Sequence, residues 1–108
     1  MKTNSEQFDQ EVVQSKIPVL VDFFATWCGP CRMLTPVLES VSKEFEGRAK
    51  VVKVDIDESP ELAARYGITA VPTLLLFAGG KVVDKAMGFQ SPKQLADMLN
   101  RVSAPVAS

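Results

Sequence analysis

The sequence contains no histidine and only two cysteines, and these shortages exclude several kinds of site. Without an imidazole, the chain cannot build a Ser-His-Asp triad, a Cys-His nucleophile pair or a histidine-ligated metal site. Two cysteines fall short of the ligands that a zinc or iron–sulfur site needs, unless two chains share the cluster. Haem attachment is excluded because Arg32 stands where a histidine would follow the second cysteine. Proton transfer is therefore left to Asp, Glu, Lys, Tyr and Cys side chains.

An excess of one charge and a long apolar run are also missing. Twelve Lys and Arg residues against 13 Asp and Glu residues give a formal net charge of -1, so we expect no nucleic-acid partner. The apolar runs are far shorter than the ~20 residues of a membrane-spanning helix, so we expect no membrane partner. The first seven residues lack the apolar region of a signal peptide, which leads us to expect a cytoplasmic location.

The composition that remains is that of an ordinary globular domain. The chain has 108 residues, of which 46% are hydrophobic and 23% charged, and a domain typically takes ~100 to 200 residues. We therefore expect a single domain over residues 1–108, with a frayed tail at 103–108.

Hydrophobic periodicity predicts helices that alternate with strands. The short apolar run at 19–24 is typical of a strand buried on both faces. A long helix is expected to start at the cysteines and to end before Gly47, with a buried stripe of Leu34, Val37, Leu38, Val41 and Phe45. The other expected elements are a helix at 5–15, strands at 51–56, 73–77 and 81–86, and helices at 60–66 and 92–102.

These elements predict a mixed sheet with helices on both faces, in three α/β/α layers with four to five strands and four helices. The strands at 19–24 and 51–56 need a helical crossover, which favours parallel pairing. Gly79 and Gly80 can form the tight turn of an antiparallel hairpin between 73–77 and 81–86. Ser91 and Gln94 are spaced as a capping box for the last helix, whose expected buried stripe is Leu95, Met98, Leu99 and Val102.

Both cysteines lie in Trp27-Cys28-Gly29-Pro30-Cys31, between the first predicted strand and the long helix. A helix start offers unpaired N–H groups and the positive end of the helix dipole, and both favour a thiolate. Cys28 is therefore the expected nucleophile. Gly29 allows a sharp turn and Pro30 suits the first helical turn, so Cys31 lies one turn away and can close a disulfide with Cys28.

A purely structural disulfide is the alternative interpretation of this pair. Closing so short a loop stabilises a chain by only ~2 kcal/mol in the chain-entropy estimate, and a chain of this size has no need of it. We therefore favour a redox-active pair.

Asp22 is the one polar residue in the strand at 19–24. Burying a carboxylate is costly unless it is protonated or paired. One interpretation is a structural ion pair with Lys53 of the neighbouring strand. The other, which we favour, is proton transfer close to the nucleophile.

The ordered set of motifs resembles the thioredoxin family. The resemblance runs from about Phe8 to Val102 and includes Val-Asp-Phe before the cysteine motif, Lys53 with Asp55, the Thr-Ala-Val-Pro-Thr segment at 69–73, Gly80 and Gly88. It implies the thioredoxin fold and a protein disulfide reductase in which Cys28 attacks the target disulfide and Cys31 resolves the mixed disulfide. The Gly-Pro pair between the cysteines is similar to that of the reducing members.

The resemblance also implies roles for residues outside the cysteine motif. Asp22 would accept the proton of Cys31, and Lys53 would tune it. The Val71–Pro72 bond would be cis and face the disulfide. A shallow apolar groove for extended peptides would be formed by Trp27, Gly29, Pro30, Val71, Pro72 and Gly88.

The family resemblance further implies that no cofactor is bound beyond the Cys28–Cys31 disulfide, and that electrons come from NADPH through thioredoxin reductase. The expected partners are this reductase and disulfide-containing proteins, and the chain is expected to be a monomer.

Two departures from the family pattern stand out: only four residues precede the first predicted helix, so the edge strand is expected to be short or missing, and Phe24 replaces a common tryptophan. The alternative function is a binding module that uses the groove without redox turnover.

Overall fold

A five-stranded sheet lies at the centre of the computed structural model, which describes residues 1–103. Its strands are β1 (Lys2–Thr3), β2 (Val19–Phe24), β3 (Lys50–Asp55), β4 (Thr73–Ala78) and β5 (Lys81–Met87). Most of the tail that we expect to fray, residues 104–108, lies outside the described residues.

The strands are arranged in the order β1-β3-β2-β4-β5. The pairs β1–β3 and β2–β3 are parallel, whereas β4 runs antiparallel to both β2 and β5. Both pairing predictions are therefore confirmed, since the crossover between β2 and β3 is parallel and the hairpin is antiparallel. The edge strand is present, and it is short as expected.

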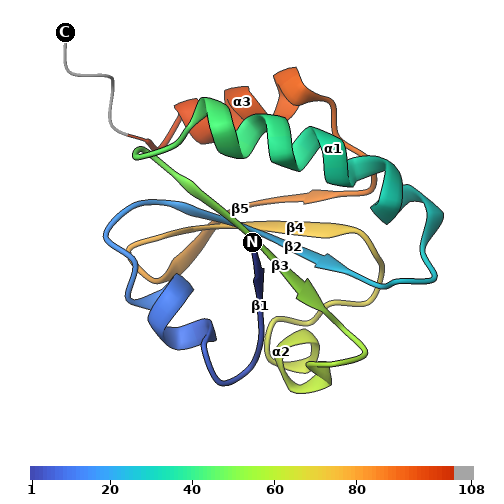
Figure 1. Ribbon diagram of the computed structural model, residues 1–108. Helices are drawn as coiled ribbons and strands as arrows, with labels where there is room; N and C mark the ends of the chain where they lie inside the picture. The colour runs from blue at the N-terminus through green and yellow to red at the C-terminus, as the bar shows by residue number, and fades with distance from the viewer. Residues whose placement is uncertain (104–108) are drawn as a thin grey trace, which may run out of the picture.

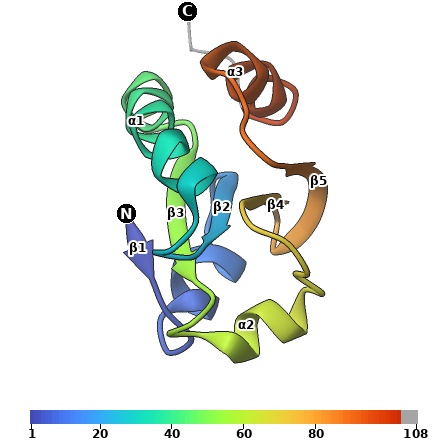
Figure 2. The ribbon, with the colours of Figure 1, turned by 90° about the vertical axis from the view of Figure 1, so that its right-hand side faces the viewer.

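Helices cover both faces of the sheet, which confirms the predicted three layers (Figures 1 and 2). The helices are η1 (Asp9–Val13), α1 (Gly29–Glu44), α2 (Pro60–Arg65) and α3 (Pro92–Asn100). Both α1 and α3 lie on one face, and α2 lies with η1 on the other (Figure 2). The capping box of α3 is formed by Ser91 and Gln94 as predicted.

The first helix is shorter than the predicted range of 5–15. It is a π-helix of five residues, and the N–H of Gln14 donates to the carbonyl of Asp9 at 2.8 Å. The segment that leads into it is held by the Asn4 side chain, whose Oδ1 accepts from two backbone N–H groups at 3.0 and 3.1 Å. Phe8, the N-cap residue of this helix, and Val12 within it are both buried, in one hydrophobic cluster with residues of the sheet.

The prediction that Val102 belongs to the buried stripe of the last helix was wrong. The helix ends at Asn100, and Val102 lies in the following turn with 37% of its surface exposed. The other three residues of that stripe, Leu95, Met98 and Leu99, are buried.

The sheet separates two hydrophobic cores. The α1-side core contains Leu20, Leu34, Leu38, Val41, Phe45, Leu74, Leu76, Leu95 and Leu99. The α2-side core contains Phe8, Val12, Val19, Val21, Phe23, Val52, Val54, Leu62, Leu75 and Phe77. Both β2 and β4 contribute alternate side chains to the two cores, as strands buried on both faces do.

The β4–β5 turn lies against the N-terminal segment. Gly79 and Gly80 have φ values of 61° and 79°, which favour glycine. A Cβ atom on Gly80 would lie 2.8 Å from the carbonyl oxygen of Val13, whereas one on Gly79 would meet nothing within 4 Å. The turn therefore approaches the end of η1 with no room for a side chain at Gly80.

Candidate active site

The two cysteines lie where β2 gives way to α1. Cys28 has an extended backbone and is the N-cap residue of α1, and Pro30 occupies the first turn of the helix. The Cα atoms of Cys28 and Cys31 are 5.3 Å apart, and a disulfide joins their side chains. The predicted pairing is therefore present.

The N-terminus of α1 points its polar groups at Cys28. The backbone N–H of Cys31 donates to Cys28 Sγ at 3.2 Å, as a capped helix donates to its N-cap side chain. When the disulfide is reduced, this N–H and the helix dipole stabilise negative charge on the same sulfur atom. Cys28 and Cys31 are only 5% and 2% exposed, so the disulfide is nearly closed off from water.

The loop that precedes β4 lies beside the disulfide. The Val71–Pro72 bond is cis, as the resemblance implies, and the carbonyl oxygen of Val71 lies 3.7 Å from Cys28 Sγ. Gly88 is held against the same loop, because its N–H donates to the carbonyl of Pro72 at 2.9 Å. Val71 and Gly88 are half-buried and Pro72 is buried.

Trp27 lies largely on the surface, with 65% of its area exposed. Its Nε1–H donates to a carboxylate oxygen of Asp57 at 3.0 Å, which fixes the ring over the loop that follows β3. Beside the ring is a hollow of about 150 Å³, lined by Trp27, Ile56, Ile68, Thr69, Ala70 and Val71.

The hollow contains only two of the six residues expected to line the peptide groove, Trp27 and Val71. Gly29 and Pro30 are exposed next to Cys28, on the surface of the first helical turn. Of the segment before β4, Val71 and Pro72 were predicted from the sequence to line the groove, whereas Thr69 and Ala70 were not. Their position in the same loop as Pro72 was the signal for them.

Asp22 is completely buried in β2, and neither of its carboxyl oxygens has a hydrogen-bond partner. Burial disfavours the charged form and raises the pKa of Asp22 to about 7, while the positive charge of Lys53 opposes that rise. The two residues face one another in the register of β2 and β3.

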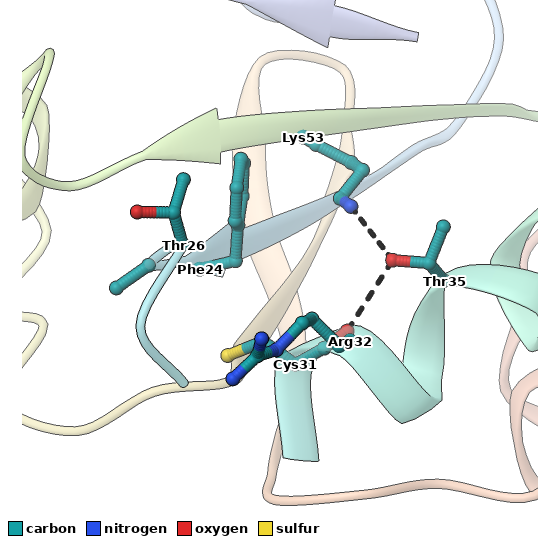
Figure 3. A pocket seen from close by; sticks show the side chains of 7 residues that line it. Phe24, Thr26, Cys31, Arg32, Thr35 and Lys53 are labelled. Atoms are coloured by element: carbon teal, nitrogen blue, oxygen red, sulfur yellow. Dashed lines mark hydrogen bonds between the residues drawn. The ribbon is translucent and has the colours of Figure 1, made fainter. Parts of the chain in front are cut away.

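One interpretation of the sequence was a structural ion pair between Asp22 and Lys53. The structure shows no such direct pair. The Lys53 ammonium donates to Thr35 Oγ1 at 2.9 Å and lies 4.4 Å from the centre of the Phe24 ring. These groups belong to a pocket of about 240 Å³ lined by Phe24, Ala25, Thr26, Cys31, Arg32, Thr35 and Lys53 (Figure 3). The pocket connects the second cysteine to the ammonium group.

Thr35 is a residue of this site that the sequence reasoning missed. The available signal was its place on α1 four residues after Cys31, which puts both residues on one face of the helix. Among residues 1–103, no group of three or more His, Cys, Asp or Glu side chains is placed to hold a metal ion. None of the helices in the same residues is long and apolar enough to cross a membrane.

Comparisons with known proteins point to one family. The family model described as Thioredoxin matches residues 1–101. A thioredoxin of Rickettsia felis is 48% identical over 94 residues, which cover 87% of this chain and 90% of that protein. Thioredoxin 1 of a Nostoc species is 49% identical over 94 residues, covering 87% and 88% of the two chains. A thioredoxin of Staphylococcus aureus is 46% identical over 101 residues, covering 94% and 95%.

Proposed function

Since the chain belongs to the thioredoxin family and is a thiol-disulfide oxidoreductase, we propose how its residues divide the reduction of a protein disulfide between them. The observation that carries the function is the Cys28–Cys31 disulfide at the N-terminus of α1. A binding module without redox turnover is not favoured, because such a module has no use for a disulfide placed at a helix N-terminus.

In the first step, the reduced enzyme forms a mixed disulfide with its target. The Cys28 thiolate attacks one sulfur atom of the target disulfide, and the bond between the two target sulfurs breaks. The electron pair of that bond leaves on the second target sulfur, which then takes a proton from water. The N–H of Cys31 and the dipole of α1 support this role, since both lower the energy of the thiolate at Cys28.

In the second step, Cys31 resolves the mixed disulfide. The Cys31 thiol loses its proton, and its sulfur attacks Cys28 Sγ, so that the intramolecular disulfide forms and the first target sulfur leaves as a thiolate. The target has then gained two electrons, which the enzyme has lost. Both target sulfurs take their protons from water, and these two protons are balanced by the one released when Cys28 ionised and the one that Cys31 lost. The 5.3 Å between the two Cα atoms supports this closure.

Asp22 is the proposed acceptor of the Cys31 proton. A general base works best when its pKa lies near the working pH, and the pKa of about 7 fits this requirement. Lys53 tunes that base, because its positive charge favours the carboxylate form.

The extended segment of the target binds beside the disulfide. Trp27, Gly29, Pro30, Val71, Pro72 and Gly88 form the proposed binding surface. The Val71 carbonyl close to Cys28 Sγ supports this role, since a backbone acceptor there can hold a strand of the target.

The oxidised enzyme needs two electrons and two protons to return to the dithiol. We propose that thioredoxin reductase supplies them from NADPH, that the chain itself binds no cofactor, and that it works as a monomer in the cytoplasm. The expected substrates are proteins with an accessible disulfide.

The test is the reduction of insulin, as a disulfide-containing protein, with a thioredoxin reductase and NADPH. The parent chain is expected to oxidise NADPH continuously while insulin thiols accumulate. The double variant Cys28→Ser, Cys31→Ser keeps the shape of the site and is expected to show neither reaction. Equal NADPH consumption by the double variant would contradict the proposed function.

A further inference from the structure

The hydroxyl of Thr35 lies between the backbone carbonyl of Cys31 and the ammonium of Lys53 (Figure 3). Its Oγ1 donates to the carbonyl oxygen of Cys31 at 3.3 Å and accepts from Lys53 Nζ at 2.9 Å. Thr35 therefore joins α1, which carries the second cysteine, to β3, which carries the lysine.

The two hydrogen bonds fix the direction of the hydroxyl. A hydroxyl has a single proton, and a protonated ammonium can only donate. Because that proton is used on the Cys31 carbonyl, an oxygen lone pair is left facing Lys53. Thr35 is half-buried, and its branched Cβ limits it to few rotamers. The site thus presents one oriented acceptor to a side chain that is otherwise long and flexible.

Lys53 is the charged group that acts on Asp22 across this site. Of the surrounding charged residues, Asp55 is occupied with the backbone N–H groups of Asp57 and Glu58, and Lys2 of the adjacent β1 pairs with Glu58. Arg32 of α1 lines the pocket but is exposed, and the β4 residue in register with Asp22 is the apolar Leu74. Within residues 1–103, the position of the Lys53 ammonium is therefore what sets the charge felt by Asp22.

We propose that Thr35 is a positioning residue for the resolving step: its hydroxyl holds the Lys53 ammonium in the pocket beside Cys31, at a fixed place relative to the Asp22 carboxyl. The inference rests on the proposed function of Asp22 and Lys53 and adds a residue that determines how they work together.

Thr35→Val keeps the shape of the side chain and removes the hydroxyl. The ammonium then has no oriented acceptor in the pocket and moves toward water, where its attraction for the Asp22 carboxylate is screened. Since Lys53 lowers the pKa of Asp22, losing its charge raises that pKa. We expect an alkaline shift of about 0.5 pH unit or more in the Asp22 titration and in the pH profile of mixed-disulfide resolution. Thr35→Ser retains the hydroxyl and is expected to keep both at the parent value.

The Asp22 titration is followed by carboxyl carbon NMR in the oxidised protein, which needs no substrate. Resolution is followed by rapid quenching between pH 5 and 9, as the decay of the mixed disulfide on Cys28 that forms transiently when the reduced protein is mixed with insulin. A Lys53→Met background gives the matched control, because Thr35→Val is expected to cause no additional shift in the absence of the ammonium.

Three results would overturn the inference: an unchanged or acid-shifted titration in Thr35→Val, the same shift in Thr35→Ser, or an undiminished shift in the Lys53→Met background. Each would leave Thr35 as a helix residue without an electrostatic role. Failure of the parent chain to reduce insulin would instead contradict the proposed function, and the NMR titration would still decide the role of Thr35.

Discussion

At the scale of single residues, the two cysteines have different surroundings although they lie three positions apart. Cys28 is the N-cap of α1 and accepts an N–H at its sulfur, whereas Cys31 lies inside the first turns and is 2% exposed. We predict that Cys31→Ser accumulates covalent mixed disulfides with target proteins, because its Cys28 can attack but nothing resolves the product. Cys28→Ser is expected to trap none.

The measurement is the amount of target bound to each variant on non-reducing gels after incubation with oxidised insulin. The double Cys→Ser variant gives the background. Equal trapping by the two single variants would mean that the position at the helix N-terminus does not select the nucleophile.

Asp22 leads to a pH-dependent stability prediction. Its pKa is about 7 in the folded protein, whereas the unfolded chain has the ordinary aspartate pKa of 3.8. At a pH between these two pKa values, the folded protein holds a proton on Asp22 that the unfolded chain has lost. Stability therefore falls as the pH rises from 3.8 through 7. We predict that the stability of Asp22→Asn relative to the parent is greater at pH 8 than at pH 4 by about 4 kcal/mol.

Urea unfolding of the oxidised protein at the two pH values measures this difference. Asp97→Asn serves as the matched control, because Asp97 is exposed and paired with Lys93, and an exposed pair contributes at most about 1 kcal/mol at either pH. A gain for Asp22→Asn that is equal at pH 4 and pH 8 would show that folding does not raise the pKa of Asp22.

At the scale of elements, α3 depends on its first turn. Ser91 Oγ accepts from the N–H of Gln94 at 3.1 Å, and the Gln94 side chain accepts from the N–H of Ser91 at 2.8 Å. We predict that Ser91→Ala lowers the free energy of unfolding by about 1 kcal/mol, because it leaves a helix N–H without its partner. Ser40→Ala, at an exposed position in the middle of α1, is expected to change it by less than about 0.5 kcal/mol.

Thermal and urea unfolding of the two serine variants provide the comparison. A loss of stability at Ser40 as large as that at Ser91 would argue that the effect comes from the serine itself and has no connection with the helix cap.

The elements also differ in how well the sequence predicts them. β2, α1 and the β4–β5 hairpin follow from local patterns, because the apolar periodicity of β2 and α1, Pro30 in the first turn of α1 and the two glycines of the hairpin agree with the final fold. The π-helix η1 and the end of α3 at Asn100 do not, since η1 has no side-chain cap and the residue that follows α3, Arg101, is no typical helix stop. Among the site residues, Asp22 stands out in the sequence as a polar residue in an apolar strand, whereas Thr35 acquires its role only when β3 brings Lys53 beside it.

At the scale of the whole molecule, the two cores share the same two strands. Leu20 of β2 packs in the α1-side core, while Val21, its neighbour in the chain, packs in the α2-side core. Neither core can therefore lose its packing without disturbing β2 and β4. We predict that Leu38→Val and Phe8→Leu, one in each core, both lower the stability by about 1 to 2 kcal/mol in a single cooperative transition.

Far-ultraviolet circular dichroism and the fluorescence of Trp27, the only tryptophan, monitor this unfolding. The two probes are expected to give coincident transitions in both variants. A fluorescence transition that separates from the loss of secondary structure in Phe8→Leu would show that the α2-side core opens independently.

The two glycines of the β4–β5 turn are neighbours with similar backbone angles, yet they differ in the substitutions that evolution can accept at each position. At Gly79 an added side chain has space, and the only cost is the strain of a positive φ angle. Asparagine adopts this angle with little strain. At Gly80 any side chain collides with the Val13 carbonyl at the end of η1. Substitution at position 80 is thus prevented by a segment more than sixty residues earlier in the chain. A homologue could accept another residue there only after a change that had shifted its N-terminal segment away from the turn.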